Sequence, residues 1–154
     1  MLTAGTKAPS FKGKDQEGNT VSLSDFKGKP LVMYFYPQDN TPTCTQQACN
    51  LRDHFGLLRN KGFQVLGVSP DNIASHKKFV DKFELPFSLI ADPDHTIIEK
   101  FGVWGEKSMY GKKYMGLLRT TFILDKKGII RHVIAKPKAK QHAEEIMDIA
   151  SKIF

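Results

Sequence analysis

An unbroken apolar run that ends at a proline constrains the fold of this chain more than any other stretch. Residues 30–36 read Pro-Leu-Val-Met-Tyr-Phe-Tyr. The run has the length and the aromatic, β-branched composition of a strand buried at the centre of a sheet. Pro37 follows and ends the strand, because proline has no amide hydrogen to donate to a neighbouring strand. We therefore expect a central strand that stops at Tyr36.

Both cysteines of the chain lie in the segment after this strand. Between positions 48 and 58 apolar residues recur at steps of three and four, which indicates an amphipathic helix. Thr41 or Thr43 is a suitable N-cap, and Pro42 suits the first turn. Cys44 is then expected in that first turn, where free amides and the helix dipole favour a nucleophilic thiolate. The alternative is that Cys44 is a small buried hydrophobic residue.

Helix geometry sets a condition on any bond between the two cysteines. Cys44 and Cys49 are five residues apart. In an intact helix this means a rise of about 7.5 Å and a Cα separation of roughly 8 to 9 Å. Disulfides usually span about 4.4 to 6.8 Å between Cα atoms. The two thiols can therefore join only if the first turns of the helix unwind.

The remaining periodicities predict one α/β domain over residues 1–154, which is of single-domain length. Short segments at 8–11 and 20–23 flank a turn-rich interval and suggest an N-terminal hairpin. Residues 104–116 show no clear periodicity and are expected to form a loop. The other expected strands are 63–69, 87–91, 117–124 and 129–135, and the expected helices are 43–60, 73–83, 97–101 and 141–153. This order predicts a mixed sheet flanked by helices, with the active loop beyond the carboxyl end of the central strand.

Charge and hydropathy limit the partners. The formal net charge is +7 at pH 7, but Lys and Arg are spread along the chain, and their densest group is the short run 136–140. Nucleic-acid binding usually shows a concentrated basic patch, so we expect a solvated surface and no nucleic-acid partner. No run is long enough to span a bilayer. The first nine residues lack the apolar core of a signal peptide, and we expect a cytoplasmic protein.

A metal or organic cofactor is not expected. Zinc sites need four ligands, typically with closely spaced cysteines and histidines. Here the two cysteines are five apart and the five histidines are scattered. Neither a Gly-x-Gly-x-x-Gly nor a Gly-Lys-Ser/Thr phosphate motif occurs. In a reducing compartment, two cysteines indicate a reactive pair more than a permanent bridge.

Pro37, Thr41 and Cys44 form the pattern Pro-x-x-x-Thr-x-x-Cys, which resembles the peroxidatic-cysteine motif of the peroxiredoxins. The run 36–45, with a second cysteine at 49, resembles the bacterioferritin comigratory protein (PrxQ) subfamily. The resemblance continues through 119–125, Arg-Thr-Thr-Phe-Ile-Leu-Asp. It departs at Thr43, where the family usually has glycine. The resemblance implies a thioredoxin-like fold with an added N-terminal β-hairpin.

The resemblance also implies roles for single residues. Cys44 would attack the peroxide and become a sulfenic acid, and Cys49 would resolve it as a disulfide. Thr41 would hydrogen-bond the thiolate or the peroxide, and Pro37 would shape the loop and shield the sulfur. Arg119 would favour the thiolate and bind the peroxide oxygens. Three further residues are candidates either to line the pocket or for ordinary packing: Trp104, Tyr110 and Thr120.

The expected function is that of a thiol-specific peroxidase in antioxidant defence. It would reduce hydrogen peroxide and organic hydroperoxides, would be recycled by thioredoxin, and would be a monomer, as this subfamily often is. One alternative is a thioredoxin-like disulfide reductase, although such enzymes normally carry Cys-x-x-Cys at the helix start. A second alternative is a basic binding or holdase protein that uses the same fold.

Overall fold

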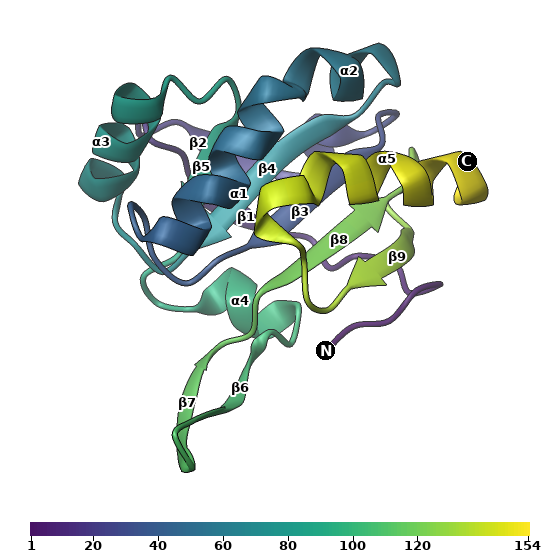
Figure 1. The fold of residues 1–154 in the computed structure, drawn as a ribbon. Coiled ribbons are helices and arrows are strands. Elements are labelled where there is room, and N and C mark those ends of the chain that lie inside the picture. Colours follow the sequence, from purple (N-terminus) through teal and green to yellow (C-terminus); the bar gives the residue numbers. More distant parts are fainter.

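The computed structural model describes residues 1–154 and contains a seven-stranded mixed sheet (Figure 1). In the centre, β3 (Leu31–Phe35) pairs in parallel with β4 (Gln64–Ser69) and antiparallel with β8 (Thr120–Leu124). All five residues of β3 are buried, as the apolar run predicts. The remaining strands of the sheet are β2 (Thr20–Ser22), β1 (Lys12–Lys14) and β5 (Ser88–Ala91) beyond β4, and β9 (Ile130–Ile134) beyond β8.

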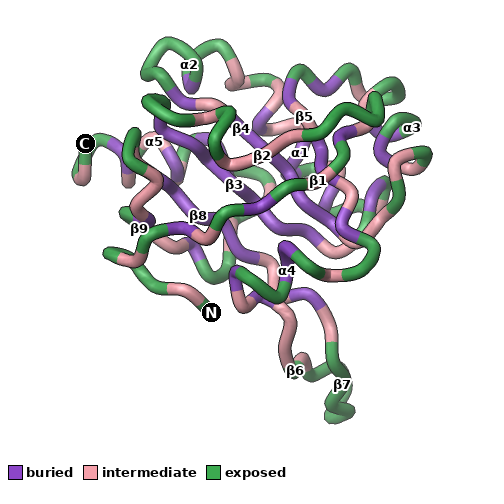
Figure 2. Tube along the Cα trace, turned by 180° about the vertical axis from the view of Figure 1, so that it is seen from behind, coloured by how far each residue is buried: buried purple, intermediate pink, exposed green.

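Helices cover both faces of the sheet, so the core has two layers. The five α-helices are α1 (Pro42–Asp53), α2 (Phe55–Asn60), α3 (Ile73–Phe83), α4 (Thr96–Lys100) and α5 (His142–Ile153), with 3-10 turns η1 (Leu23–Phe26) and η2 (Ala139–Gln141). Val32 and Tyr34 pack on the face covered by α1, α3 and α5, whereas Met33 and Phe35 pack toward α4 and the N-terminal segment. Figure 2 shows the resulting band of buried residues along β3, β4 and β8. No helix is long and apolar enough to cross a membrane.

The predicted mixed sheet flanked by helices is confirmed, and the N-terminal hairpin is present with a shifted boundary. Residues 8–11 do not form its first strand. Ala8 and Phe11 are buried in the core, and the amide of Ala8 donates to the carbonyl of Gly128. Regular pairing starts only at Lys12, where β1 runs antiparallel to β2 and contacts β5.

The predicted helix over 43–60 is two helices, α1 and α2. The break falls at His54, whose φ of −111° and ψ of 10° are not helical. The Nδ1 atom of His54 lies 2.8 Å from the carbonyl oxygen of Asn50, which also accepts the His54 amide. The side chain therefore bonds locally to the backbone, and such bonds compete with regular helix continuation.

The prediction of a loop over 104–116 is wrong. Strands β6 (Trp104–Met109) and β7 (Lys112–Leu117) form a hairpin that projects from the body of the molecule (Figure 1). Its two turn residues, Tyr110 and Gly111, have φ of 51° and 77°, the left-handed values of a tight two-residue hairpin turn. Most residues on both strands are exposed or half-buried, so no alternating apolar pattern marks them. The expected strand 117–124 is accordingly divided between β7 and β8.

Strand register brings the site segments to one edge of the sheet. Phe35 at the end of β3 pairs with Thr120 at the start of antiparallel β8. The segment that leaves β3 therefore lies beside Arg119, which precedes Thr120. The segment that leaves parallel β4 emerges at the same edge, where open α/β sheets usually bind ligands.

Gly67 in β4 lies in contact with Tyr34 in β3, and the close packing leads to a stability prediction. A Cβ at Gly67 would fall 2.6 Å from Leu89 Cδ2 and 3.0 Å from Tyr34 Cζ. We expect Gly67→Ala to lower the free energy of unfolding by about 1–3 kcal/mol, because the core is overpacked. Urea denaturation followed by circular dichroism measures this. Gly56→Ala is the control, because no atom lies within 4 Å of its Cβ position; equal midpoints for the two variants would contradict the prediction.

Candidate active site

The segment between β3 and α1 presents Cys44 at a helix N-terminus. Asn40 has a φ of 60°, Thr41 is the N-cap, and Pro42 opens the helix. The amide of Thr45 donates to the carbonyl of Thr41 at 2.8 Å and closes the first turn. The amide of Cys44 precedes this bond and has no intrahelical acceptor. The predicted position of Cys44 in the first turn is confirmed, and the helix dipole favours an anion there.

Arg119 reaches the sulfur of Cys44 across the edge of the sheet. Its Nη1 atom donates to Cys44 Sγ at 3.0 Å, although 75 residues separate the two in the chain. Cys44 is 2% exposed, so the contact is shielded from water on the cysteine side. A guanidinium at this distance stabilises a thiolate and leaves further N–H groups for an incoming oxygen.

Gln47 holds the other branch of the same guanidinium and was not identified from the sequence. Arg119 Nη2 donates to Gln47 Oε1 at 2.7 Å, and Gln47 is fully buried. Its Nε2 atom has no hydrogen-bond partner within the protein. The position three residues after Cys44 places Gln47 on the same helix face. This three-residue spacing is the sequence signal that could have identified Gln47 as part of the site.

The loop residues expected in the site lie around Cys44 in different ways. Thr41 Oγ1 donates to the carbonyl oxygen of Gln38 at 3.1 Å, so the hydroxyl proton is used within the loop. Pro37 is half-buried directly after Tyr36. Thr43, which replaces the family's usual glycine, is exposed in the first turn of α1 and has no positive φ. A β-branched residue therefore fits the loop without a left-handed conformation.

Cys49 is half-buried on the same helix, and both thiols are free. The two cysteines occupy one uninterrupted helical segment, as the sequence predicts. Immediately after Cys49, Asn50 links α1 to the C-terminal part of the chain. Its Nδ2 atom donates to the Lys140 carbonyl and to Glu144 Oε1, and its Oδ1 accepts from the Ala143 amide at 2.7 Å.

Tyr34 is a second buried polar group near the thiols that sequence reasoning did not identify as part of the site. Its hydroxyl has no hydrogen-bond partner within the protein. Burial raises the pKa of the Tyr34 phenol well above its usual value, the negative charges of Cys44 and Asp39 raise it further, and Arg119 opposes them. The phenol is therefore neutral and feels both charged groups. Because Tyr34 lies inside an apolar run, the sequence does not indicate that its hydroxyl is close to charged groups of the site.

None of the three further lining candidates makes a hydrogen bond to Cys44. Tyr110 is 97% exposed at the hairpin tip, so of the two roles left open for it, lining the pocket is excluded. Trp104 packs against His95 with ring centroids 4.3 Å apart. Thr120 is buried in β8 and donates to the carbonyl of Leu118. Packing is the role that the structure assigns to each of the latter two.

One group of side chains is close enough together to hold a cation. The ligand atoms of Asp39, Asp71 and His76 lie within 4.8 Å of one another. Each is already engaged: His76 Nδ1 lies 2.7 Å from Asp39 Oδ2, and Asp71 Oδ2 accepts from the Asp39 amide and from Ser69 Oγ. A metal ion here would have to replace these internal bonds.

Comparison with known proteins gives the site a family context. Residues 4–133 match the model of the AhpC/TSA family. The chain belongs to this family. It is 46% identical over 147 residues to a putative peroxiredoxin Bcp of Haemophilus influenzae, with 96% of this chain and 95% of that protein covered. It is 44% identical over 147 residues to peroxiredoxin Bcp of Escherichia coli, with 96% and 94% covered.

A solved structure extends the likeness to three dimensions. Bacterioferritin comigratory protein of Xanthomonas campestris, studied for its alkyl peroxide reduction, matches with a TM-score of 0.86 and 32% identity. The match covers 92% of this chain and 90% of that one. The resemblance noted in the sequence is confirmed. This AhpC/TSA member is a thiol peroxidase with the thioredoxin-like fold, an oxidoreductase of antioxidant defence.

Gln47 generates a prediction about this peroxidase. Gln47→Met keeps the side-chain volume but leaves Arg119 Nη2 without its acceptor. We expect the second-order rate constant for hydroperoxide reduction to fall about tenfold, as for loss of one hydrogen bond to a charged group. Stopped-flow measurement on pre-reduced protein tests this. Gln46→Met is the matched control, because Gln46 is exposed on the same helix turn; an equal rate in both variants would exclude a role for Gln47.

Proposed function

We propose that Cys44 is the peroxidatic nucleophile of this enzyme. The observation that carries the proposal is the 3.0 Å contact between Arg119 Nη1 and the buried Cys44 Sγ at the N-terminus of α1. Two independent sources of positive potential, the guanidinium and the helix end, act on one sulfur. Pro37 shapes the wall of the loop. Thr41 fixes the loop through its bond to Gln38.

The chemistry balances with these residues. The Cys44 thiolate attacks one peroxide oxygen, an S–O bond forms, and the O–O bond breaks. The leaving oxygen takes a proton and departs as water or an alcohol, and Cys44 becomes a sulfenic acid. Arg119 donates hydrogen bonds to the peroxide oxygens while negative charge moves from sulfur to the leaving oxygen. Gln47 keeps the guanidinium in the orientation that this requires.

Cys49 is the proposed resolving cysteine. Its thiolate attacks the Cys44 sulfur, an S–S bond forms, the S–O bond breaks, and the hydroxide leaves as water after protonation. Because five helical residues hold the Cα atoms roughly 8 to 9 Å apart, α1 must unwind from its N-terminus before this step. Asn50, with three bonds to η2 and α5, is where we expect the unwinding to stop.

A dithiol protein returns the enzyme to its reduced form. The family implies peroxide substrates and a reductant of the thioredoxin type. We assign this role to thioredoxin itself, because an unwound Cys44–Cys49 disulfide is exposed and open to attack by an external thiolate. The whole chain, residues 1–154, acts as one domain and as a monomer. Its need for a reducing partner supports a cytoplasmic location.

Turnover with the thioredoxin system tests these roles directly. Wild type, Cys44→Ser and Cys49→Ser are compared for peroxide consumption coupled to NADPH through thioredoxin and thioredoxin reductase. We expect wild type to turn over and Cys44→Ser to lose at least about 10³-fold, because the nucleophile is removed. Cys49→Ser should complete one rapid reaction with peroxide and then stop as the sulfenic acid.

Other outcomes have defined meanings. Steady turnover by Cys49→Ser would contradict intramolecular resolution. Disulfide reduction by wild type without peroxide consumption would support a disulfide reductase in place of the peroxidase roles assigned here. Salt-sensitive DNA binding that persists in Cys44→Ser, with no peroxide consumption, would support a basic binding protein.

Hydrogen exchange tests the unwinding. Amides between Thr45 and Cys49 should lose protection on oxidation, because their helical bonds must open to bring the sulfurs together. Protection should persist from His54 onward, because the His54 amide bonds the carbonyl of Asn50, where the unwinding is expected to stop. Mass spectrometry of peptides from reduced and oxidised protein measures this, with α3 as the internal control and Cys49→Ser as the variant that cannot form the disulfide. Equal protection of residues 45–49 in both redox forms would rule out the unwinding.

A further inference from the structure

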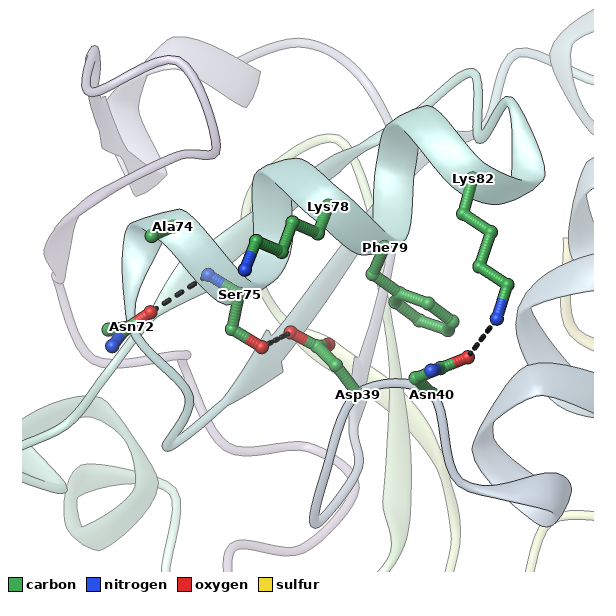
Figure 3. A pocket seen from close by; sticks show the side chains of 8 residues that line it. All are labelled: Asp39, Asn40, Asn72, Ala74, Ser75, Lys78, Phe79 and Lys82. Carbon is green, nitrogen blue, oxygen red and sulfur yellow. Dashed lines mark hydrogen bonds between the residues drawn. The ribbon is translucent and has the colours of Figure 1, made fainter.

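A buried polar network fastens the loop that carries Cys44 to helix α3. Asp39, at 7% exposure, lies in this loop between Tyr36 and Thr41. Its Oδ1 accepts from the Tyr36 hydroxyl at 2.6 Å, and its Oδ2 accepts from Ser75 Oγ at 2.8 Å. Figure 3 shows the hydrogen bond between Asp39 and Ser75. Both residues line a pocket of about 370 Å³ between the loop and the helix. The reaction described above uses none of these groups.

Both ring nitrogens of His76 have a hydrogen-bond partner. Nδ1 lies 2.7 Å from Asp39 Oδ2, and Nε2 lies 3.0 Å from the carbonyl oxygen of Ile90. Both neighbours are acceptors, and a neutral imidazole has only one N–H. Asp39 also accepts from Tyr36 and Ser75, which favours its carboxylate form, and beside a carboxylate His76 satisfies both acceptors as an imidazolium. His76 and Asp39 therefore form a buried ion pair, with the histidine fully buried.

This ion pair matters for the thiolate because Asp39 and Cys44 belong to one electrostatic environment. Tyr36 bonds Asp39 and stacks on Tyr34 with ring centroids 5.3 Å apart, and Tyr34 and Cys44 belong to the same buried cluster. In agreement with this proximity, the negative charges of Cys44 and Asp39 both raise the pKa of the buried Tyr34 phenol. An uncompensated carboxylate there would oppose ionisation of Cys44, since like charges disfavour each other's charged form.

We propose that His76 is a positioning residue for the peroxidatic reaction: its imidazolium neutralises Asp39, so that a carboxylate can anchor the Cys44 loop without opposing the Cys44 thiolate. The inference rests on the proposed role of Cys44 as nucleophile. An amide in place of Asp39 would carry no charge but would bond the loop more weakly, because charge-assisted hydrogen bonds are roughly twice as strong. The pair combines a strong anchor with a nearly zero net charge.

Other charged and titratable groups around the pair do not replace His76. Tyr36 from β3 is a neutral donor, because burial raises the pKa of its phenol well above the usual value. Asp71, after β4, adds negative charge and accepts from the Asp39 amide. Lys78 and Lys82 line the solvent side of the pocket, where Lys82 Nζ bonds Asn40 Oδ1 at 3.3 Å (Figure 3). His76 is thus the only cation bonded to the Asp39 carboxylate.

A double-mutant cycle that removes the two charges singly and together tests the proposal. The variants are His76→Asn, Asp39→Asn and the double variant, each pre-reduced and mixed with hydrogen peroxide in a stopped-flow instrument across a range of pH. His76→Asn leaves the Asp39 charge unbalanced. Its rate profile should move to higher pH, and its rate at neutral pH should fall roughly three- to tenfold. The double variant has a neutral pair, and its profile should return to that of wild type.

Controls separate charge from folding and from the nucleophile assignment. Lys77→Gln removes one positive charge from the adjacent, exposed position on α3 and should leave the profile unchanged. If His76→Asn does not fold, as judged by circular dichroism, the proposal is tested with Asp39→Asn alone. The pH profile of the peroxide reaction of Asp39→Asn should stay in place or move to lower pH.

Two results would overturn the proposal. One is a double variant as slow as His76→Asn, which would show a purely structural role. The other is a shift of Asp39→Asn to higher pH. Absence of a rapid peroxide reaction in wild type would instead refute the nucleophile assignment, and the two failures are therefore distinguishable.

Discussion

The antiparallel pairing of β3 with β8 is the constraint on which the active site depends. It sets Phe35 opposite Thr120, and so brings Arg119 to the loop that follows β3. A shift of this register by one residue would move every side chain of β8 to the opposite face and take Arg119 away from Cys44. Because β3 and β8 are both fully buried, hydrophobic packing on the two faces fixes the register. Packing in the core therefore determines where the guanidinium of Arg119 lies.

Much of this arrangement follows from local sequence. The buried strand, its end at Pro37 and a helix with Cys44 in its first turn were predicted from residues next to one another, because strand termination and helix capping are local effects. Arg119 is different. Nothing within its own segment distinguishes it from other arginines, and only the resemblance to the peroxiredoxins identified it. The sequence leaves Tyr110 open between lining the pocket and ordinary packing, because the hairpin that carries it has no apolar periodicity.

Contacts between distant segments could not be predicted in this way. His76 and Asp39 are 37 residues apart, and each looks like an ordinary surface residue in its own segment. Their pairing exists only because β4 returns the chain to the edge of the sheet where the Cys44 loop leaves it. The break at His54 has a different, local cause: a side-chain bond to Asn50 outweighs a continuous helical pattern. Gln47 alone carried a usable signal, its spacing of three from Cys44.

Side-chain hydrogen bonds hold the later turns of α1 more firmly than the first ones, which suits the proposed cycle, in which the helix is both folded and open. Toward its start, the buried Nε2 of Gln47 has no partner within the protein, and a group in that state costs about 1–3 kcal/mol. The buried hydroxyl of Tyr34 also has no hydrogen-bond partner within the protein. From Asn50 onward the helix has three side-chain bonds to η2 and α5. When oxidation of Cys44 changes the charge that Arg119 faces, the first turns lose their main electrostatic contact, while the later turns keep all of theirs. We therefore expect opening to start at the N-terminus and to reach Cys49 before the bonds of Asn50 oppose it.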